Sequence, residues 1–167
     1  MLKALFIVGA AIACLVLVAA IAGYALPKAH VASRNARLAA APERVFAVLT
    51  DVDRYPAWRS DVRTVEVIAR EPLRWREHGS NGAITFEVQE SSAPTRLVTR
   101  IADTSLPFGG TWTFALSAAA ERGTAVTITE NGEVHNPIFR FMSRFVFGHS
   151  ATVERYLSDL RRQFDKP

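Results

Sequence analysis

The stretch APERVFAVLTDVDRYPAW, residues 41–58, says most about the fold of this 167-residue chain. Pro42 is well placed to open a helix, because its fixed φ suits the first helical position, and the helix dipole favours Glu43 in the first turn. One apolar face of a short helix ending near Thr50 follows: Val45, Phe46, Val48 and Leu49. A second helical turn or two is expected from Asp51 to Trp58. The stretch therefore predicts two short consecutive helices.

Outward from this stretch, apolar and polar residues alternate with a period of two, which is typical of half-buried strands. Strands are predicted at 30–38, 62–69, 73–78, 83–90, 96–102, 111–118 and 125–134. Turn signals separate them, among them Glu71-Pro72, Ala93-Pro94 and Gly109-Gly110. Because these connections are short, they favour an antiparallel meander.

The C-terminal segment returns to helical periodicity. Asn136 is a suitable N-cap and Pro137 a suitable first helical residue. Apolar residues from Ile138 to Phe164 recur at spacings of three and four. We expect one helix of nearly 30 residues, long enough to lie across a whole sheet, with a bend or close contact at Gly148.

The order of elements defines the expected fold class. One strand, two short helices, six strands and one long helix predict an α+β domain, in which a curved antiparallel seven-stranded sheet surrounds the long C-terminal helix. Glycine-rich bends and inward apolar residues are what such curvature requires. This arrangement leaves a space between the sheet and the helix.

At residues 41–51 and 53–58, and in its C-terminal helix, the chain resembles the polyketide cyclase/dehydrase and START-like (SRPBCC) superfamily, whose members share the helix-grip fold. The matching pieces cover almost all of residues 30–165. The resemblance implies a deep cavity between sheet and helix that holds a lipid-like or other mostly apolar small molecule. Many relatives are soluble, so the N-terminal apolar segment of this chain suggests work on a molecule that partitions into the bilayer.

The N-terminal segment predicts a membrane anchor. Residues 4–26 carry no charge, and as a helix these 23 residues would rise roughly 35 Å, enough to cross a hydrocarbon core about 30 Å thick. We therefore expect residues 1–27 to be a single-pass transmembrane helix and residues 28–167 to form one domain. The alternative is a cleaved secretory signal, because Ala20-Ile21-Ala22 fits the A-x-A pattern. The apolar run is, however, longer than the ~7–15 residues of a typical signal core.

Charge and cysteine content narrow the list of partners. Residues 28–167 carry 19 Lys and Arg against 16 Asp and Glu, without a basic run, so no nucleic-acid partner is expected. The charges flanking the apolar run differ too little to assign a side of the membrane. Cys14, the only cysteine, lies within that run, which either compartment permits. The sequence carries no signal for the oligomeric state.

Strand alternation identifies candidate ligand-binding residues. Glu77 shares a strand face with Trp75, and Glu130 shares one with Ile128. A carboxylate on an apolar face must be paired, hydrogen-bonded or protonated. The predicted binding residues are Trp58, Trp75, Glu77, Phe86, Trp112, Phe114, Ile128, Glu130, Met142 and Phe145.

Two interpretations of the inward carboxylates remain open. Either group could orient the polar end of a ligand, or it could pair with an arginine. Three arginines are candidates for that pairing: Arg59, Arg100 and Arg140.

Catalytic signals are weak. The four histidines are scattered without metal-ligand spacing, and neither a phosphate loop nor a nucleophile-elbow motif is present. No metal, cofactor or catalytic residue is predicted, and binding or transfer of a ligand is favoured. Two other classes remain: a cyclase/dehydrase-like enzyme using Glu77, Glu130 or His78 as general acid or base, and a membrane-associated interaction module without ligand.

Overall fold

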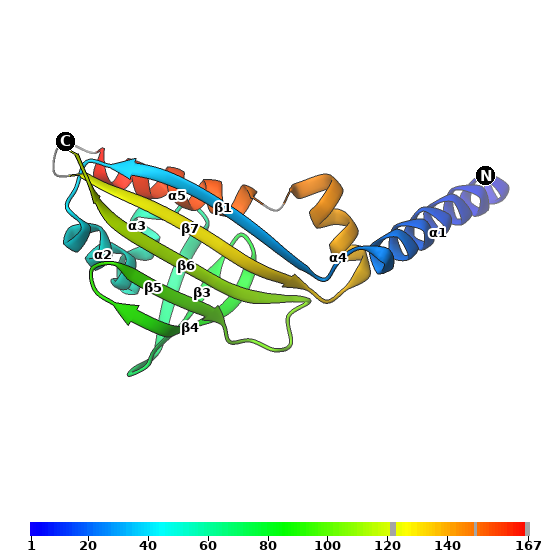
Figure 1. Ribbon diagram of the computed structural model, residues 1–167. Helices are drawn as coiled ribbons and strands as arrows, with labels where there is room; N and C mark the ends of the chain where they lie inside the picture. The colour runs from blue at the N-terminus through cyan, green and yellow to red at the C-terminus, as the bar shows by residue number, and fades with distance from the viewer. Residues whose placement is uncertain (121–122, 149, 166–167) are drawn as a thin grey trace.

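The computed structural model describes residues 1–120, 123–148 and 150–165, with the side chains of Val146 and Phe147 left out. A curved antiparallel sheet surrounds the C-terminal helix, and the N-terminal helix α1 (Leu2–Ala25) projects away from both (Figure 1). This is the predicted helix-grip fold preceded by one apolar helix. Helix α1 is long and apolar enough to cross a membrane.

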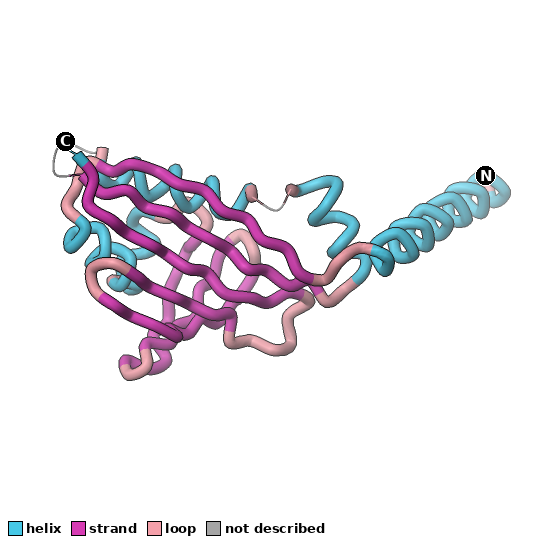
Figure 2. The backbone as a smooth tube through the Cα atoms, in the orientation of Figure 1, coloured by secondary structure: helices cyan, strands magenta, loops and turns pink. Residues whose placement is uncertain are grey.

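The seven predicted strands are confirmed, with bounds that differ by a few residues. They are β1 (Ala29–Leu38), β2 (Val62–Arg70), β3 (Leu73–Gly79), β4 (Gly82–Ser92), β5 (Arg96–Ile101), β6 (Phe108–Ala119) and β7 (Gly123–Val134). Their order in the sheet is β1-β7-β6-β5-β4-β3-β2, and every neighbouring pair is antiparallel. Figure 2 shows the strands side by side in one curved sheet. The first strand therefore closes a meander by pairing with the last.

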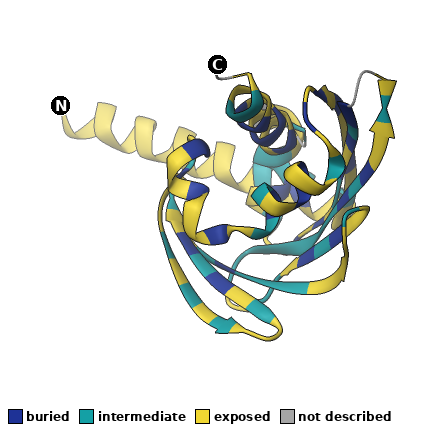
Figure 3. Cartoon of the chain, turned by 90° about the vertical axis from the view of Figure 1, so that its left-hand side faces the viewer, coloured by how far each residue is buried: buried dark blue, intermediate teal, exposed yellow. Residues whose placement is uncertain are grey.

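The sheet bends where its register shifts. Shifts occur twice along the β2–β3 pair and once along the β4–β5 pair, between Val88 and Glu90. An extra residue in one strand bends it and increases its twist. The curvature lets the sheet wrap around the helices, as the view along the sheet shows (Figure 3).

The stretch 41–58 forms the short helices predicted for it. Helix α2 (Pro42–Thr50) begins at Pro42 and buries Val45, Phe46 and Leu49. One 3₁₀ turn, η1 (Val52–Arg54), leads into α3 (Tyr55–Trp58). The Tyr55 hydroxyl donates a 2.6 Å hydrogen bond to the carbonyl oxygen of Leu49, which ties α3 back onto α2.

The interruption expected at Gly148 is confirmed, but the prediction that one long helix continues past it is wrong. Helix α4 (Pro137–Met142) and a π-helical turn, η3 (Ser143–Phe147), end at Gly148, whose φ of 74° takes the backbone out of the helical region. A separate helix, α5 (Ala151–Phe164), lies across the sheet, whereas α4 lies beside α1 (Figure 1). The predicted N-cap is confirmed, since Asn136 Oδ1 accepts hydrogen bonds from the backbone of Ile138 and Phe139.

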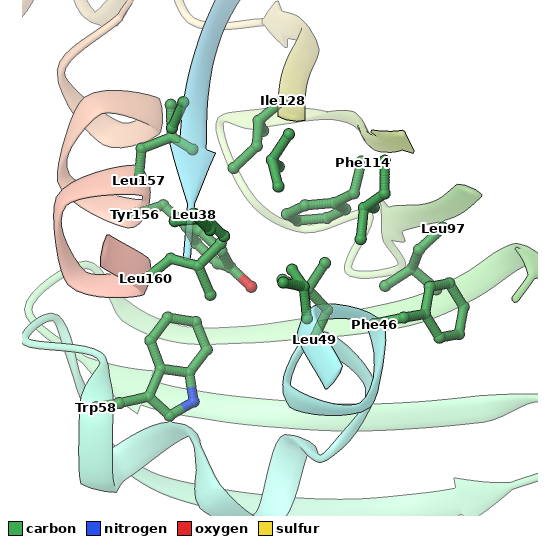
Figure 4. Close-up of a cluster of buried hydrophobic side chains, with 14 of the residues drawn as sticks. Leu38, Phe46, Leu49, Trp58, Leu97, Phe114, Ile128, Tyr156, Leu157 and Leu160 are labelled. Carbon is green, nitrogen blue, oxygen red and sulfur yellow. The ribbon is translucent and has the colours of Figure 1, made fainter. Parts of the chain in front are cut away.

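The hydrophobic core fills only one end of the space under the sheet. Tyr156, Leu157 and Leu160 of α5 point toward side chains of the sheet in Figure 4. Val126 and Ile128 of β7 belong to this core, but Glu130 and Val134, further along the same strand, line a cavity. That end of β7 pairs with the start of β1, where the chain arrives from α1.

Candidate functional site

A cavity of about 680 Å³ lies between the sheet and α5. Its size falls within the range of small-molecule sites, roughly 300–1,000 Å³. Aromatic and aliphatic side chains from four strands form much of the wall: Trp75, Ile84, Phe86, Ile101, Trp112 and Phe114. The cavity is thus the mostly apolar space that strand alternation predicts.

Six of the ten predicted binding residues lie on the cavity wall: Trp75, Glu77, Phe86, Trp112, Phe114 and Glu130. Register explains why they converge. Trp112 is directly opposite Glu130 across β6 and β7, and Trp75 is directly opposite Phe86 across β3 and β4. The Trp75 and Phe86 rings stack with centroids 5.5 Å apart.

The other four predicted residues do not line the cavity. Trp58, the last residue of α3, has its ring edge-on to that of Tyr156 with centroids 5.4 Å apart, and Ile128 is fully buried in the core. Met142 and Phe145 follow α4 away from the sheet, because the backbone turns at Gly148. Phe145 is 63% exposed.

Glu77 is a paired carboxylate. Its Oε1 accepts a 2.8 Å hydrogen bond from Arg59 Nη1 and a 2.9 Å bond from the Trp75 indole. Burial raises the pKa of Glu77, and the Arg59 guanidinium and the Trp75 N–H oppose that rise. For Glu77 the structure therefore favours the pairing with Arg59 that the sequence left open.

The Arg59 guanidinium is surrounded by two carboxylates and two aromatic rings. Asp61 accepts two further hydrogen bonds, at 3.2 Å from Nε and 2.8 Å from Nη2. The guanidinium also lies over the rings of Tyr55 and Tyr156, 5.1 and 4.8 Å from their centroids. Its charge is thus neutralised within the protein. The other two candidate partners lie elsewhere: Arg100 is 3.5 Å from Glu87, and Arg140 contacts backbone carbonyls near α1.

Glu130 is in a different environment. Its side chain is 19% exposed, and no described residue gives its Oε2 a hydrogen bond. The nearest cation candidate, Nε2 of His30, is 3.9 Å from Oε1, beyond hydrogen-bond distance. Burial raises the pKa of Glu130 to about 7. The carboxyl group can therefore either donate or accept a hydrogen bond near neutral pH.

The lining residues outside the predicted binding set include His30, Tyr156 and Phe139. His30 precedes Ala32 by two positions on β1 and so shares the inward face. Its ring occupies the space above Gly132, where any Cβ would collide with it. The alternation of β1 could have identified His30, but the placement of Phe139 depends on the break at Gly148.

His78 is excluded as a cavity acid or base. Because Trp75 and Glu77 point inward, the neighbouring position on β3 points outward, and His78 is exposed on the opposite face. Within the described ranges, no group of three His, Cys, Asp or Glu residues could hold a metal ion.

Helix α4 links the cavity wall to α1. Arg140 is 6% exposed, and its Nη1 donates to the carbonyl oxygens of Leu26 at 3.0 Å and Tyr24 at 3.5 Å. A cation at the carbonyl end of a helix satisfies free acceptors and complements the helix dipole. Phe139, the residue before Arg140, faces the cavity. One short helix thus contacts both α1 and the cavity.

The fold and its cavity define a START-like protein of the helix-grip class. A family model described as "Polyketide cyclase / dehydrase and lipid transport" matches residues 29–164, and the chain belongs to this family. No curated protein sequence matches the chain.

Solved structures show the same fold at low sequence identity. A START superfamily protein from Mycobacterium smegmatis has a TM-score of 0.68 at 17% identity, covering 81% of this chain and 97% of that one. The Zhui aromatase/cyclase from a Streptomyces species has a TM-score of 0.64 at 13% identity, covering 82% and 94%. A conserved protein from Geobacillus kaustophilus has a TM-score of 0.68 at 14% identity, covering 81% and 95%. The fold is consistent with binding of a ligand in the cavity.

Proposed function

We propose that this protein is a membrane-tethered binding or transfer protein for a small, mostly apolar or lipid-like molecule. The observation that carries the proposal is the cavity of about 680 Å³ with an apolar wall and one carboxyl group, Glu130, that lacks a hydrogen-bond partner at Oε2 among the described residues. Small-molecule sites usually combine apolar walls with a few polar groups that orient the ligand. The aromatic wall would hold the body of the ligand and Glu130 its polar end.

The buried charges of the cavity favour a ligand with a neutral polar end. Arg59 is occupied by Glu77 and Asp61, so it offers little to a ligand carboxylate. A second anion would also raise the cost of ionising Glu130, because like charges in a poorly solvated site repel. A hydroxyl group can donate to the Glu130 carboxylate or accept from its protonated form. An apolar alcohol therefore suits the site better than a fatty acid.

Helix α1 supplies the membrane tether in this proposal. It runs from Leu2 to Ala25, is long and apolar enough to span, and presents apolar side chains on all sides. A retained anchor agrees with the contacts of Arg140, which uses the carbonyl groups at the end of α1 as acceptors. The residues that follow, 28–167, would act as one ligand-binding domain.

A cyclase/dehydrase-like enzyme is the second candidate, and the pKa of Glu130 is the observation that favours it. A carboxyl group with a pKa of about 7 is suited to general acid–base catalysis at neutral pH. Turnover of the bound molecule would distinguish the enzyme from the carrier. An interaction module without ligand does not explain an open, apolar cavity.

Native mass spectrometry of the full chain, extracted in detergent from the membrane fraction, tests both the tether and the ligand. We expect the intact mass of the uncleaved chain with a retained small molecule. A mature chain that begins near Gly23 and is found in the soluble fraction would overturn the tether. An empty chain under mild extraction would count against the ligand.

Photo-crosslinking tests the chemistry of the ligand. The probes are a long-chain alcohol with a photoactivatable diazirine and the fatty acid of the same chain length, added to the full chain in lipid nanodiscs. We expect the alcohol to label peptides of the cavity wall more strongly than the acid at neutral pH, and Glu130→Gln to weaken labelling by the alcohol. Glu90→Gln, on the exposed end of β4, is the matched control. Equal labelling by both probes would contradict the role of Glu130.

A further inference from the structure

We infer that α4 and η3 lie in the membrane surface and that the cavity opens toward the bilayer beside them, so that the ligand enters and leaves past Phe139. The inference rests on the proposed function, because it takes α1 to be a membrane anchor. It adds an interaction surface, residues 138–145, and assigns the lipid bilayer as its partner.

The first argument is where the exposed apolar side chains gather. After α1, five large apolar side chains among the described residues are exposed: Val31, Ile68, Ile138, Phe139 and Phe145. All except Ile68 belong to α4, η3 or the first residues of β1, next to the end of α1. An exposed apolar patch of this kind on a soluble surface marks an interaction site.

The second argument is that α4 is fixed at the depth where α1 would leave the membrane. Gly23 lies so close to Pro137 that any Cβ would collide with the Pro137 carbonyl. Arg140 bonds to the carbonyls of Tyr24 and Leu26, and the backbone N–H of Val134 donates a 2.8 Å bond to the Lys28 carbonyl. A tyrosine followed by a lysine is typical of the membrane–water interface. Helix α4 therefore lies at the same level.

The third argument is the chemistry of the surface. Residues 137–147 contain two arginines and no acidic residue, and of the two only Arg144 is exposed. Exposed phenylalanines beside a single cation suit the headgroup region, where apolar and cationic side chains are both favoured. The turn at Gly148 directs this segment away from the sheet, and Ile138, Phe139 and Phe145 are exposed.

The cavity opens on this side. Phe139, Ser143, Gly148 and Ala151 all line it, and Phe139 is 49% exposed. Phe139 thus contacts both the cavity and the outer surface. An apolar ligand passing there would stay in contact with lipid or aromatic side chains and would avoid water, whose exclusion from apolar surface drives its binding.

Spin-label accessibility tests the position of α4 and η3. In a Cys14→Ala background, Phe145→Cys and the control Ser117→Cys, on the outer face of β6, are labelled in the full chain in nanodiscs. Neither residue lines the cavity. We expect the label at 145 to collide with oxygen, which concentrates in lipid, more than with an aqueous nickel chelate, and the label at 117 to show the reverse.

The outcomes separate this inference from the proposed function. If the label at 145 is as accessible to nickel as that at 117, while the chain stays in the nanodisc and retains ligand, the bilayer-facing opening is wrong and the proposed function stands. The same conclusion follows if a partner protein, rather than lipid, shields position 145. If the chain does not enter nanodiscs at all, the membrane tether and this inference both fail.

A rate measurement tests the route of the ligand. The photoactivatable alcohol is added to nanodiscs, and its crosslinking to the cavity is followed over time. The double variant Ile138→Ser/Phe145→Ser should load several-fold more slowly than the unchanged chain. Both side chains lie outside the cavity, and in this inference they insert into lipid and so place the cavity opening against the bilayer. Ile68→Ser removes an exposed apolar side chain from β2 and should load at the unchanged rate. Equal rates in all three proteins would overturn the route.

Discussion

Arg59 and Glu77 form a 2.8 Å ion pair in which each side chain is only 8% exposed. The second inward carboxyl group of the sheet, Glu130, is held less closely: His30 Nε2 is 3.9 Å from its Oε1, and no described residue gives its Oε2 a hydrogen bond. Two carboxyl groups on one cavity wall thus have different environments. Glu77 is paired with Arg59, and in the proposed function Glu130 would contact the ligand.

Glu77→Gln should destabilise the protein. The change removes the charge that compensates buried Arg59, and breaking a buried ion pair costs about 3–5 kcal/mol. We expect a loss toward the lower end of that range, because Asp61 still neutralises Arg59 and the amide oxygen can still accept from Trp75. The measurement is the free energy of unfolding of the full chain in detergent.

Glu90→Gln is the control for that change. Glu90 pairs with Arg96 at 3.0 Å, but both side chains are close to half exposed, and exposed pairs contribute about 0–1 kcal/mol. Equal losses in the free energy of unfolding from Glu77→Gln and Glu90→Gln would show that the ion pair between Arg59 and Glu77 does not stabilise the fold.

Glu130→Gln should change how stability depends on pH. The folded protein holds the Glu130 proton up to a pKa of about 7, whereas the unfolded chain releases it near 4.5. The contribution of Glu130 to the free energy of unfolding is therefore fully present below pH 4.5 and is lost as the pH rises through 7. Between pH 5 and 8 the unchanged chain should lose on the order of 2–3 kcal/mol more than Glu130→Gln.

The pH experiment compares unfolding of the two proteins at pH 5 and pH 8 in the same detergent. His30 Nε2 lies 3.9 Å from Glu130 Oε1, so Glu130→Gln is also compared in a His30→Gln background. A parallel pH dependence in the presence and absence of Glu130 would mean that the carboxyl group is hydrated and not held in an apolar wall.

Much of the fold can be predicted from local patterns. Pro42 with Glu43 opens a helix because N1 and first-turn preferences are local, and strand alternation depends only on the period of the backbone. The same alternation correctly placed Trp75, Phe86 and Trp112 on the cavity wall, since side chains of neighbouring antiparallel strands share a face wherever the register holds.

What the sequence could not predict depends on tertiary contacts. Gly148 indicates a bend, but the spacing of apolar residues continues through it, so the sequence does not reveal that the helix ends there and that Met142 and Phe145 lie away from the sheet. Arg59 pairs with Glu77 because the end of α3 packs next to β3, a tertiary contact that the sequence does not show. Arg140 could have paired with a carboxylate by composition alone, but it bonds to the carbonyls at the end of α1.

Leu160→Ala should cost on the order of 2–5 kcal/mol, because Leu160 is fully buried where α5 contacts the sheet and its removal leaves a void. Arg161→Ala, one residue further on the exposed side of α5, should have little effect. Unfolding of both variants in detergent gives the comparison. Similar small effects would mean that α5 does not pack into the sheet.

Gly23→Ala should separate α1 from α4. A Cβ at Gly23 would collide with the carbonyl of Pro137, whereas a Cβ at Gly9 would meet no atom within 4 Å. Both substitutions raise helix propensity by roughly 0.5–1 kcal/mol, so Gly9→Ala controls for that gain. The readout is the distance distribution between spin labels at Leu15 on α1 and Thr127 on the outer face of β7, in a Cys14→Ala background. Gly23→Ala should shift or broaden the distribution, and Gly9→Ala should leave it unchanged. If Gly23→Ala also leaves it unchanged, α1 does not pack on Pro137, and this contact does not help to hold α4 at the level of the membrane surface.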